Sequence, residues 1–221
     1  MRIRLLNSGI LFMLFAFAVC ISCNNQQSDK QTIFANNGYF NVALIDTQLN
    51  KSTDDAERVY SSGAPFVYFH ATQSLDTVRT AFVFYNTNDS TASVRWYRFL
   101  NGKWMLKDSI SNLPGGSRPV NAVFQDFNFD GQRDIYLQEA MVSENGLGYG
   151  LLFTIDPKTK QLTEQPVFRD MGDMSADAAT KSIISITLKA LGHDLPPAKC
   201  TVISQWENGQ LKTTSRLCDS D

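Results

Sequence analysis

Short apolar runs separated by turn residues dominate the chain from about residue 38 onward. Many of these runs are aromatic or β-branched, as in FVYFHA (66–71) and RTAFVFYN (79–86), and such runs are typical of β-strands. The Asn-Gly pairs at 101–102 and 208–209 and the segment PKTK (157–160) mark hairpin turns between them. The pattern predicts an all-β fold, an antiparallel β-sandwich or barrel of roughly eight to ten strands.

Helical periodicity is weak. The best helix candidate is 45–60, and 175–182 is read as a single helical turn. No linker or shift in composition divides the chain, so we expect one domain over 33–221. The sequences around the two Asn-Gly hairpins do not repeat at a fixed period, which argues against the repeated blades of a β-propeller. The large aromatic residues are expected to fill the core: Phe82, Phe84, Trp96, Trp104 and Trp206.

The segment 182–191 has the two-residue period of a half-buried strand. Ile184, Ile186 and Leu188 alternate in it with polar residues. Val202 and Trp206 are expected to continue the same apolar face in the last hairpin.

The first 23 residues have the pattern of an export signal. Arg2 and Arg4 precede an apolar run that ends at Ile21, shorter than the ~20 residues of a spanning helix. Ser22-Cys23 then resembles the lipobox of bacterial lipoproteins, although Cys20 stands where that motif usually has Leu.

We therefore expect a signal peptide over 1–22, a lipidated Cys23 and a flexible tether over 23–32. The protein would be anchored by lipid in the cell envelope, at the outer membrane or facing the periplasm. Lipidation of Cys20, or an ordinary secretory signal, is the alternative.

Cys20 leaves with the signal and Cys23 carries the lipid, so Cys200 and Cys218 remain as a pair in an oxidising compartment, and we expect a disulfide. A three-residue loop over 208–210 would pair Glu207 with Leu211 and set the two cysteines opposite each other. Two free thiols, or a register slipped by one residue, is the alternative.

Residues 126–134 (DFNFDGQRD) have the spacing of a calcium loop. Alternate residues of a tight loop point to one side, so the side-chain oxygens of several residues would converge on one point. Gly131 permits the backbone turn that aims the Gln132 carbonyl at the same point. The predicted ligands are Asp126, Asn128, Asp130, Gln132 and Asp134, and this anionic oxygen set suits Ca²⁺.

The loop departs from an EF-hand at its twelfth position, which is Leu137 instead of a bidentate Glu. It continues as a strand, as in the calcium loops of integrin-type repeats, and we expect weak affinity, with a Kd of about 10⁻⁴–10⁻³ M. A polar hairpin turn at Asp130-Gly131 without a metal is the alternative.

DFNFDGQRDIYLQ, ENGLGYG, LLFTIDPKTKQLTEQPVF, TKSIIS and QWENGQL together resemble a bacterial family of secreted or lipid-anchored β-domains. These domains carry a calcium loop and are related to periplasmic lysozyme inhibitors. The resemblance covers roughly 120–215 and implies an antiparallel sandwich, calcium at the acidic loop and binding of a lysozyme. The inhibitory loop Ser-Gly-x-x-Tyr is not matched, because the first Tyr after Ser62-Gly63 is Tyr68. Tyr149 and Asn145 in ENGLGYG are the alternative partner loop.

Catalytic signals are few. No Gly-x-Ser-x-Gly elbow occurs, and the histidines are His70, in an aromatic strand, and His193, in a turn-like stretch. Asp170, Asp173 and Asp177 could supply a glycosidase pair, but a solvated loop is the preferred interpretation.

A net charge of -2 and the absence of a basic cluster argue against nucleic acid as a partner. We expect a non-enzymatic envelope protein that binds a protein partner, a lysozyme or another envelope protein. A calcium-dependent glycan hydrolase, a glycan-binding lipoprotein and a purely structural lipoprotein are the alternatives.

Overall fold

A computed structural model of the protein describes residues 40–51, 57–61, 66–72, 78–114, 119–139, 147–192 and 195–219. The predicted signal peptide, Cys23, the tether, Asn145 and His193 lie outside these residues. No helix within them is long and apolar enough to cross a membrane.

The described chain is mostly antiparallel β-strand, as expected, and forms three sheets in which sequence neighbours pair. A 3₁₀ turn, η1 (Val42–Leu44), and a short helix, α2 (Ile45–Asn50), precede them. The first sheet contains β1 (Glu57–Ser61), β2 (Phe66–Thr72), β3 (Thr80–Asn86), β4 (Thr91–Leu100) and β5 (Lys103–Pro114). The second contains β6 (Pro119–Gln125), β7 (Asp134–Glu139), β8 (Gly150–Ile155) and β9 (Leu162–Glu164). After the 3₁₀ turn η2 (Pro166–Phe168), the third contains β10 (Gly172–Asp177), β11 (Ser182–Lys189), β12 (Ala198–Glu207) and β13 (Gln210–Cys218).

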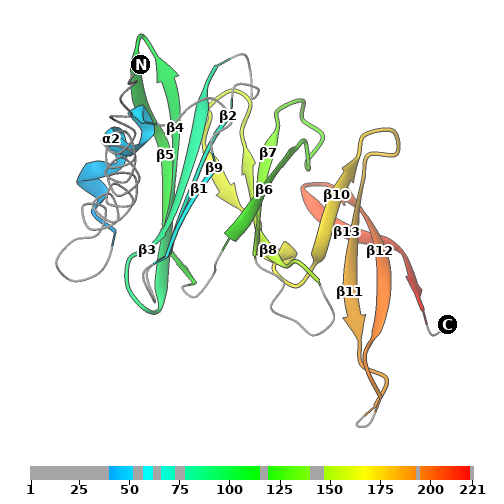
Figure 1. The fold of residues 1–221 in the computed structure, drawn as a ribbon. Helices are drawn as coiled ribbons and strands as arrows, with labels where there is room; N and C mark the ends of the chain where they lie inside the picture. Colours follow the sequence, from blue (N-terminus) through cyan, green and yellow to red (C-terminus); the bar gives the residue numbers. More distant parts are fainter. Residues whose placement is uncertain are drawn as a thin grey trace, which may run out of the picture.

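The three sheets stand face to face in a row, with α2 outside the first sheet (Figure 1). Three apolar clusters fill the spaces between these layers. Phe82, Phe84 and Trp96 of the first sheet pack on Leu137 and Phe153 of the second. The outer face of the first sheet packs on α2. The third cluster joins the second and third sheets. Successive meanders also pack in this way in β-propellers, but these three sheets form an open, sandwich-like stack.

Three expectations about secondary structure were wrong in detail. The helix predicted over 45–60 ends at Asn50, and Glu57–Ser61 pairs with β2 instead. The stretch 172–177 is a strand and not a solvated loop or helical turn, because Met174 and Ala176 alternate with polar residues and pack inward. The described residues accordingly contain thirteen strands, more than the eight to ten expected.

The predicted disulfide is present between Cys200 and Cys218, but the hairpin reaches it by another register. The turn has two residues, so Glu207 pairs with Gln210 instead of Leu211. A β-bulge beside Ile203 and Ser204 then shifts the register by one residue and brings the two cysteines opposite each other.

The apolar face predicted for β11 is reversed. Ile183 packs toward the second sheet, and Val202 pairs with Ser185. Directly opposed residues share a face of an antiparallel sheet. Ile184, Ile186 and Leu188 therefore lie on the face opposite to Val202 and Trp206.

Candidate functional site

The acidic loop, residues 126–133, connects β6 to β7 and is attached to the core by its aromatic residues. Phe127 is fully buried and packs on Tyr136, and the partly buried Phe129 lies against the same cluster. The Trp206 indole N–H donates to the Phe127 carbonyl at 2.7 Å. The third sheet thus holds a loop that belongs to the second.

The polar residues of the acidic loop bind its own backbone. Asp126 accepts hydrogen bonds from the amides of Asp130, at 3.1 Å, and Gly131, at 2.9 Å. Asp130 accepts from the Gln132 amide at 2.8 Å and from the Asn128 side-chain amide at 2.9 Å. The loop is coiled with these side chains turned toward one another, and Gly131 has the positive φ (89°) that the turn was predicted to need.

Asp134, the first residue of β7, is buried and joins the acidic loop to β8 through its hydrogen bonds. One of its oxygens accepts from the amides of Phe127 (2.8 Å) and Asn128 (3.3 Å), and the other accepts from the Ile155 amide at 2.9 Å. Burial raises the pKa of Asp134 to about 7, against the opposing effect of its backbone hydrogen bonds, and the nearby carboxylates add to the rise.

The donor set of the acidic loop fits a hard cation in its chemistry. A carboxylate oxygen has two lone pairs, so one hydrogen bond at each oxygen leaves capacity for a ligand bond. No group of three or more His, Cys, Asp or Glu side chains in the described residues is arranged as a metal site. The predicted calcium shell, however, also uses oxygens of other kinds, namely the Asn128 side-chain oxygen and the Gln132 backbone carbonyl. Lys160 donates to the Gln132 side chain at 2.5 Å, so the positively charged ammonium group of Lys160, in the turn between β8 and β9, already contacts the loop.

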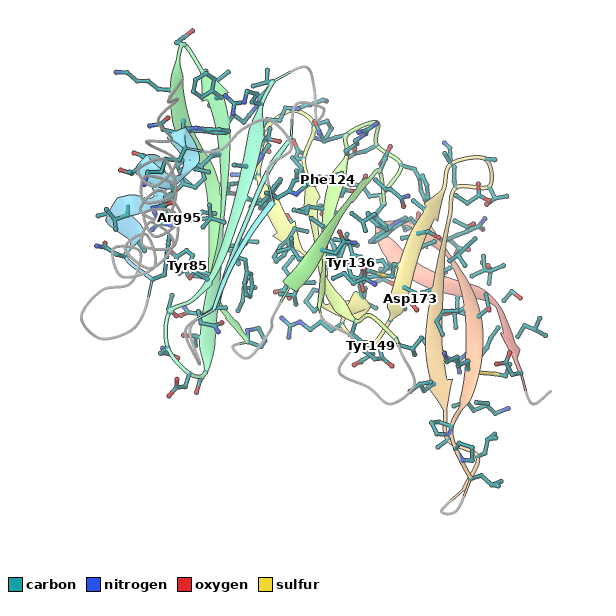
Figure 2. All side chains as sticks on the ribbon, in the orientation of Figure 1. Tyr85, Arg95, Phe124, Tyr136, Tyr149 and Asp173 are labelled. Atoms are coloured by element: carbon teal, nitrogen blue, oxygen red, sulfur yellow. A yellow bond between two sulfur atoms is a disulfide. The ribbon has the colours of Figure 1, made fainter. Side chains whose placement is uncertain are left out.

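A second loop, residues 147–149, lies where the second and third sheets meet, and it carries the partly exposed Tyr149 (Figure 2). Asp173 of β10 binds it twice. The Asp173 carboxylate accepts from the Gly148 amide at 3.1 Å, and the Asp173 amide donates to the Gly148 carbonyl at 3.1 Å. The buried Tyr136 hydroxyl donates to the same carbonyl at 2.7 Å, and Gln138 donates to the Asp173 carboxylate at 3.2 Å.

The glycines on both sides of Tyr149 lie in close contact with β7, Gly150 with its backbone and Gly148 with the Gln138 side chain. A Cβ at Gly150 would lie 2.2 Å from the Leu137 carbonyl oxygen and 2.7 Å from the Tyr136 ring. A Cβ at Gly148 would lie 2.1 Å from the Gln138 side-chain nitrogen. Leu147 is buried on the N-terminal side. The backbone of Tyr149 is therefore fixed on both sides while its side chain reaches the surface.

The two loops lie at opposite ends of the second sheet. The acidic loop precedes Asp134, at the start of β7, whereas Gly150 pairs with Gln138 near the end of that strand. They do not border one cleft, so a single ligand in contact with both is not supported.

Other candidate residues have structural contacts. Asp177 accepts from the Thr180 hydroxyl and the Ala179 amide and so caps a turn, and these hydrogen bonds hold its pKa below the usual range. Asp170 is exposed. His70 is partly buried, with its ring 4.7 Å from that of Phe124. Asp173 was considered only as a catalytic candidate, and its contact with Gly148 across 25 residues had no local sequence signal.

No protein-family model matches the chain, and no curated protein matches its sequence. Among solved structures it is similar to one described as a Xanthomonas type IV secretion system related protein, with 12% sequence identity. The match covers 74% of this chain and 95% of that chain with a TM-score of 0.23, which is too low to establish even a shared fold. These comparisons do not confirm the calcium-loop family predicted from the sequence.

Proposed function

We propose that the protein is a lipid-anchored envelope protein that binds a protein partner through Tyr149, and that calcium braces the opposite end of its second sheet. The observation that carries the proposal is the fixed backbone around Tyr149. Gly150 lacks room for a side chain against the Leu137 backbone, a Cβ at Gly148 would displace the Gln138 side chain, and Asp173 holds Gly148 with two hydrogen bonds. A rigid loop with an aromatic side chain suits a binding residue, because little conformational entropy is lost on association.

A lysozyme is the partner to test first, because of the resemblance of 120–215 to inhibitor-related domains. The full-length protein, kept in solution by a non-ionic detergent, is mixed with several lysozymes, and the rate of cell-wall lysis and complex formation are measured. We expect slower lysis, and we expect Tyr149→Ala to weaken the complex by at least about tenfold. Leu106→Ala, at an exposed residue of β5, is the matched control and should leave binding unchanged.

Unchanged lysis with complex formation would reject inhibition and retain a binding role. No complex with any lysozyme would reject lysozyme as the partner. If Tyr149→Ala bound as well as the native protein, the partner surface would lie elsewhere.

Calcium would bind the acidic loop through Asp126, Asn128, Asp130 and the Gln132 carbonyl, with Asp134 completing the shell directly or through water. The support is the oxygen-only donor set and the crowding of three carboxylates in nine residues. Its role would be structural, since a cation offsets the repulsion among these groups.

The calcium proposal is tested by thermal unfolding in excess calcium and in chelator. We expect a higher Tm with calcium, and we expect Asp130→Ala to abolish the difference. Asp156→Ala is the matched control, because Asp156 also caps a turn near that end of the sheet but is not a predicted ligand. Identical melting in calcium and chelator would reject the site.

A further inference from the structure

A small pocket lies between α2 and the turn that joins β4 to β5, at the end of the stack away from the third sheet (Figure 1). Its volume is about 300 Å³, and it is lined by Asp46, Asn50, Gly102, Lys103 and Trp104. That volume is near the lower limit for ligand pockets, so the pocket suits one small molecule and not a polymer. Neither of the two loops described above lines it, so a ligand bound here is independent of the proposed function.

One wall of the pocket comes from the short helix α2. Ile45 and Leu49 are buried against the first sheet, and Asp46 and Asn50 each follow one of them along the helix. Asp46 and Asn50 are four residues apart, so their side chains are neighbours on one side of α2. A carboxylate and a carboxamide therefore reach the pocket together.

The other wall comes from the tight turn between β4 and β5. Asn101 and Gly102 both have a positive φ, 52° and 76°, as a two-residue hairpin turn requires, so β5 begins directly with Lys103 and Trp104. Trp104 is only 9% exposed. Its ring centroid lies 5.2 Å from that of Phe99 and 5.3 Å from the Arg79 guanidinium carbon. The aromatic wall is therefore held in place before any ligand binds.

The charged groups of the pocket are opposite in sign and are not paired with each other. The side chains of Asp46, Asn50 and Lys103 form no hydrogen bond or ion pair with any part of the chain that the structure describes. A carboxylate, an amide and an ammonium group are thus all available within one small space. A ligand that carries a cation and an anion a few bonds apart satisfies both charges, and charge-assisted hydrogen bonds are the stronger ones.

We infer that this pocket binds a zwitterionic α-amino acid with an apolar side chain. The ammonium group of the ligand donates to the Asp46 carboxylate and to the Asn50 carbonyl oxygen. The carboxylate of the ligand accepts from the Lys103 ammonium group, and the apolar side chain lies against Trp104. Because the charged groups of the protein are exposed, the affinity is modest, with a Kd on the order of millimolar.

The test is an NMR titration of the full-length protein, labelled with nitrogen-15 at its tryptophan indoles and kept in non-ionic detergent, with leucine as the probe. The indole signal of Trp104, identified by its loss in Trp104→Phe, should shift and saturate at millimolar leucine. The signals of Trp96 and Trp206, which lie outside the pocket, should not move. N-acetyl-leucine lacks the ammonium group and leucine methyl ester lacks the carboxylate, so each should bind about fivefold more weakly or worse.

Two variants test the assigned contacts. Asp46→Asn and Lys103→Met each remove one charge at an exposed residue, and each should weaken leucine binding by about fivefold or more without disturbing the fold. Lys107→Met, at an exposed residue of β5 outside the pocket, is the matched control and should bind leucine as the native protein does.

A Trp104 signal that does not move at any leucine concentration would overturn the inference. So would leucine binding that neither derivative loses, or leucine binding that Lys103→Met leaves unchanged. Glucose, a neutral polyol of similar size, should not shift the signal, and a shift by glucose but not by leucine would assign the pocket to a sugar instead.

Discussion

The two loops at the ends of the second sheet are held in place by opposite means. In the acidic loop, side chains supply the order, since carboxylates cap backbone amides and Phe127 fills the core. In the Tyr149 loop, the absence of side chains at Gly148 and Gly150 lets the backbone pack closely, and Asp173 binds it from another sheet. The first arrangement crowds negative charge, and under our proposal a bound cation would stabilise it. The second is complete without one and leaves an aromatic side chain at the surface.

The largest effect is expected from removing the aromatic anchor of the acidic loop. Phe127→Ala should lower the free energy of unfolding by about 4 kcal/mol, because Phe127 is fully buried. Phe129→Ala, in the same loop but only partly buried, is the control and should cost about 1 kcal/mol. Urea unfolding measures both. Equal losses would show that Phe127 does not anchor the loop.

Adding a methyl group to the Tyr149 loop should be nearly as costly. Gly150→Ala is expected to lose about 3 kcal/mol, because its Cβ would meet the backbone oxygen of Leu137. Gly148→Ala should lose less, because the Gln138 side chain can move aside. Urea unfolding of the two variants gives the order, and the reverse order would contradict the packing described for this loop.

The acidic loop should make stability depend on pH when calcium is chelated. The folded protein binds the Asp134 proton more tightly than the unfolded chain, with a pKa of about 7 against 3.8. The free energy of unfolding should therefore fall as the pH rises from about 4 to about 7, by about 2 kcal/mol between pH 5 and pH 8. Asp134→Asn should lack this dependence. A native profile as flat as that of the variant would mean that Asp134 ionises normally.

The smallest effect on stability is expected from Asp173→Ala, about 1 kcal/mol, since the carboxylate is at the surface and its loss frees one backbone amide. Amide exchange at Gly148 should nevertheless accelerate, and partner binding should weaken along with it. Faster exchange of the acidic loop in this variant would contradict the independence of the two ends.

The sequence predicted the features that depend on neighbouring residues. The strand runs and the hairpins are local patterns, and the all-β fold that they predicted is confirmed. The acidic loop is also a local pattern, and its turn at Gly131 has the predicted positive φ. The disulfide was also predicted, although the predicted hairpin register was wrong by one residue at the turn. A β-bulge farther along the hairpin restores that residue and brings the two cysteines opposite each other.

Features that depend on distant contacts were not predicted. The alternation of Ile184, Ile186 and Leu188 indicates a strand but not which face is buried, because that depends on the sheet that packs against it. The contact of Asp173 with Gly148 likewise exists only after the second and third sheets meet. The polar strand 172–177 was missed because its inward residues are only Met174 and Ala176.

Hydrogen–deuterium exchange of the full-length protein, with and without calcium, tests the central contrast most directly. The amides of Asp130, Gly131 and Gln132 should exchange more slowly with calcium, because their carboxylate acceptors become fixed by the cation. The amides of Gly148 and Asp173 should exchange at the same rate in both conditions. Unchanged exchange in the acidic loop, or equal slowing in both loops, would contradict the account.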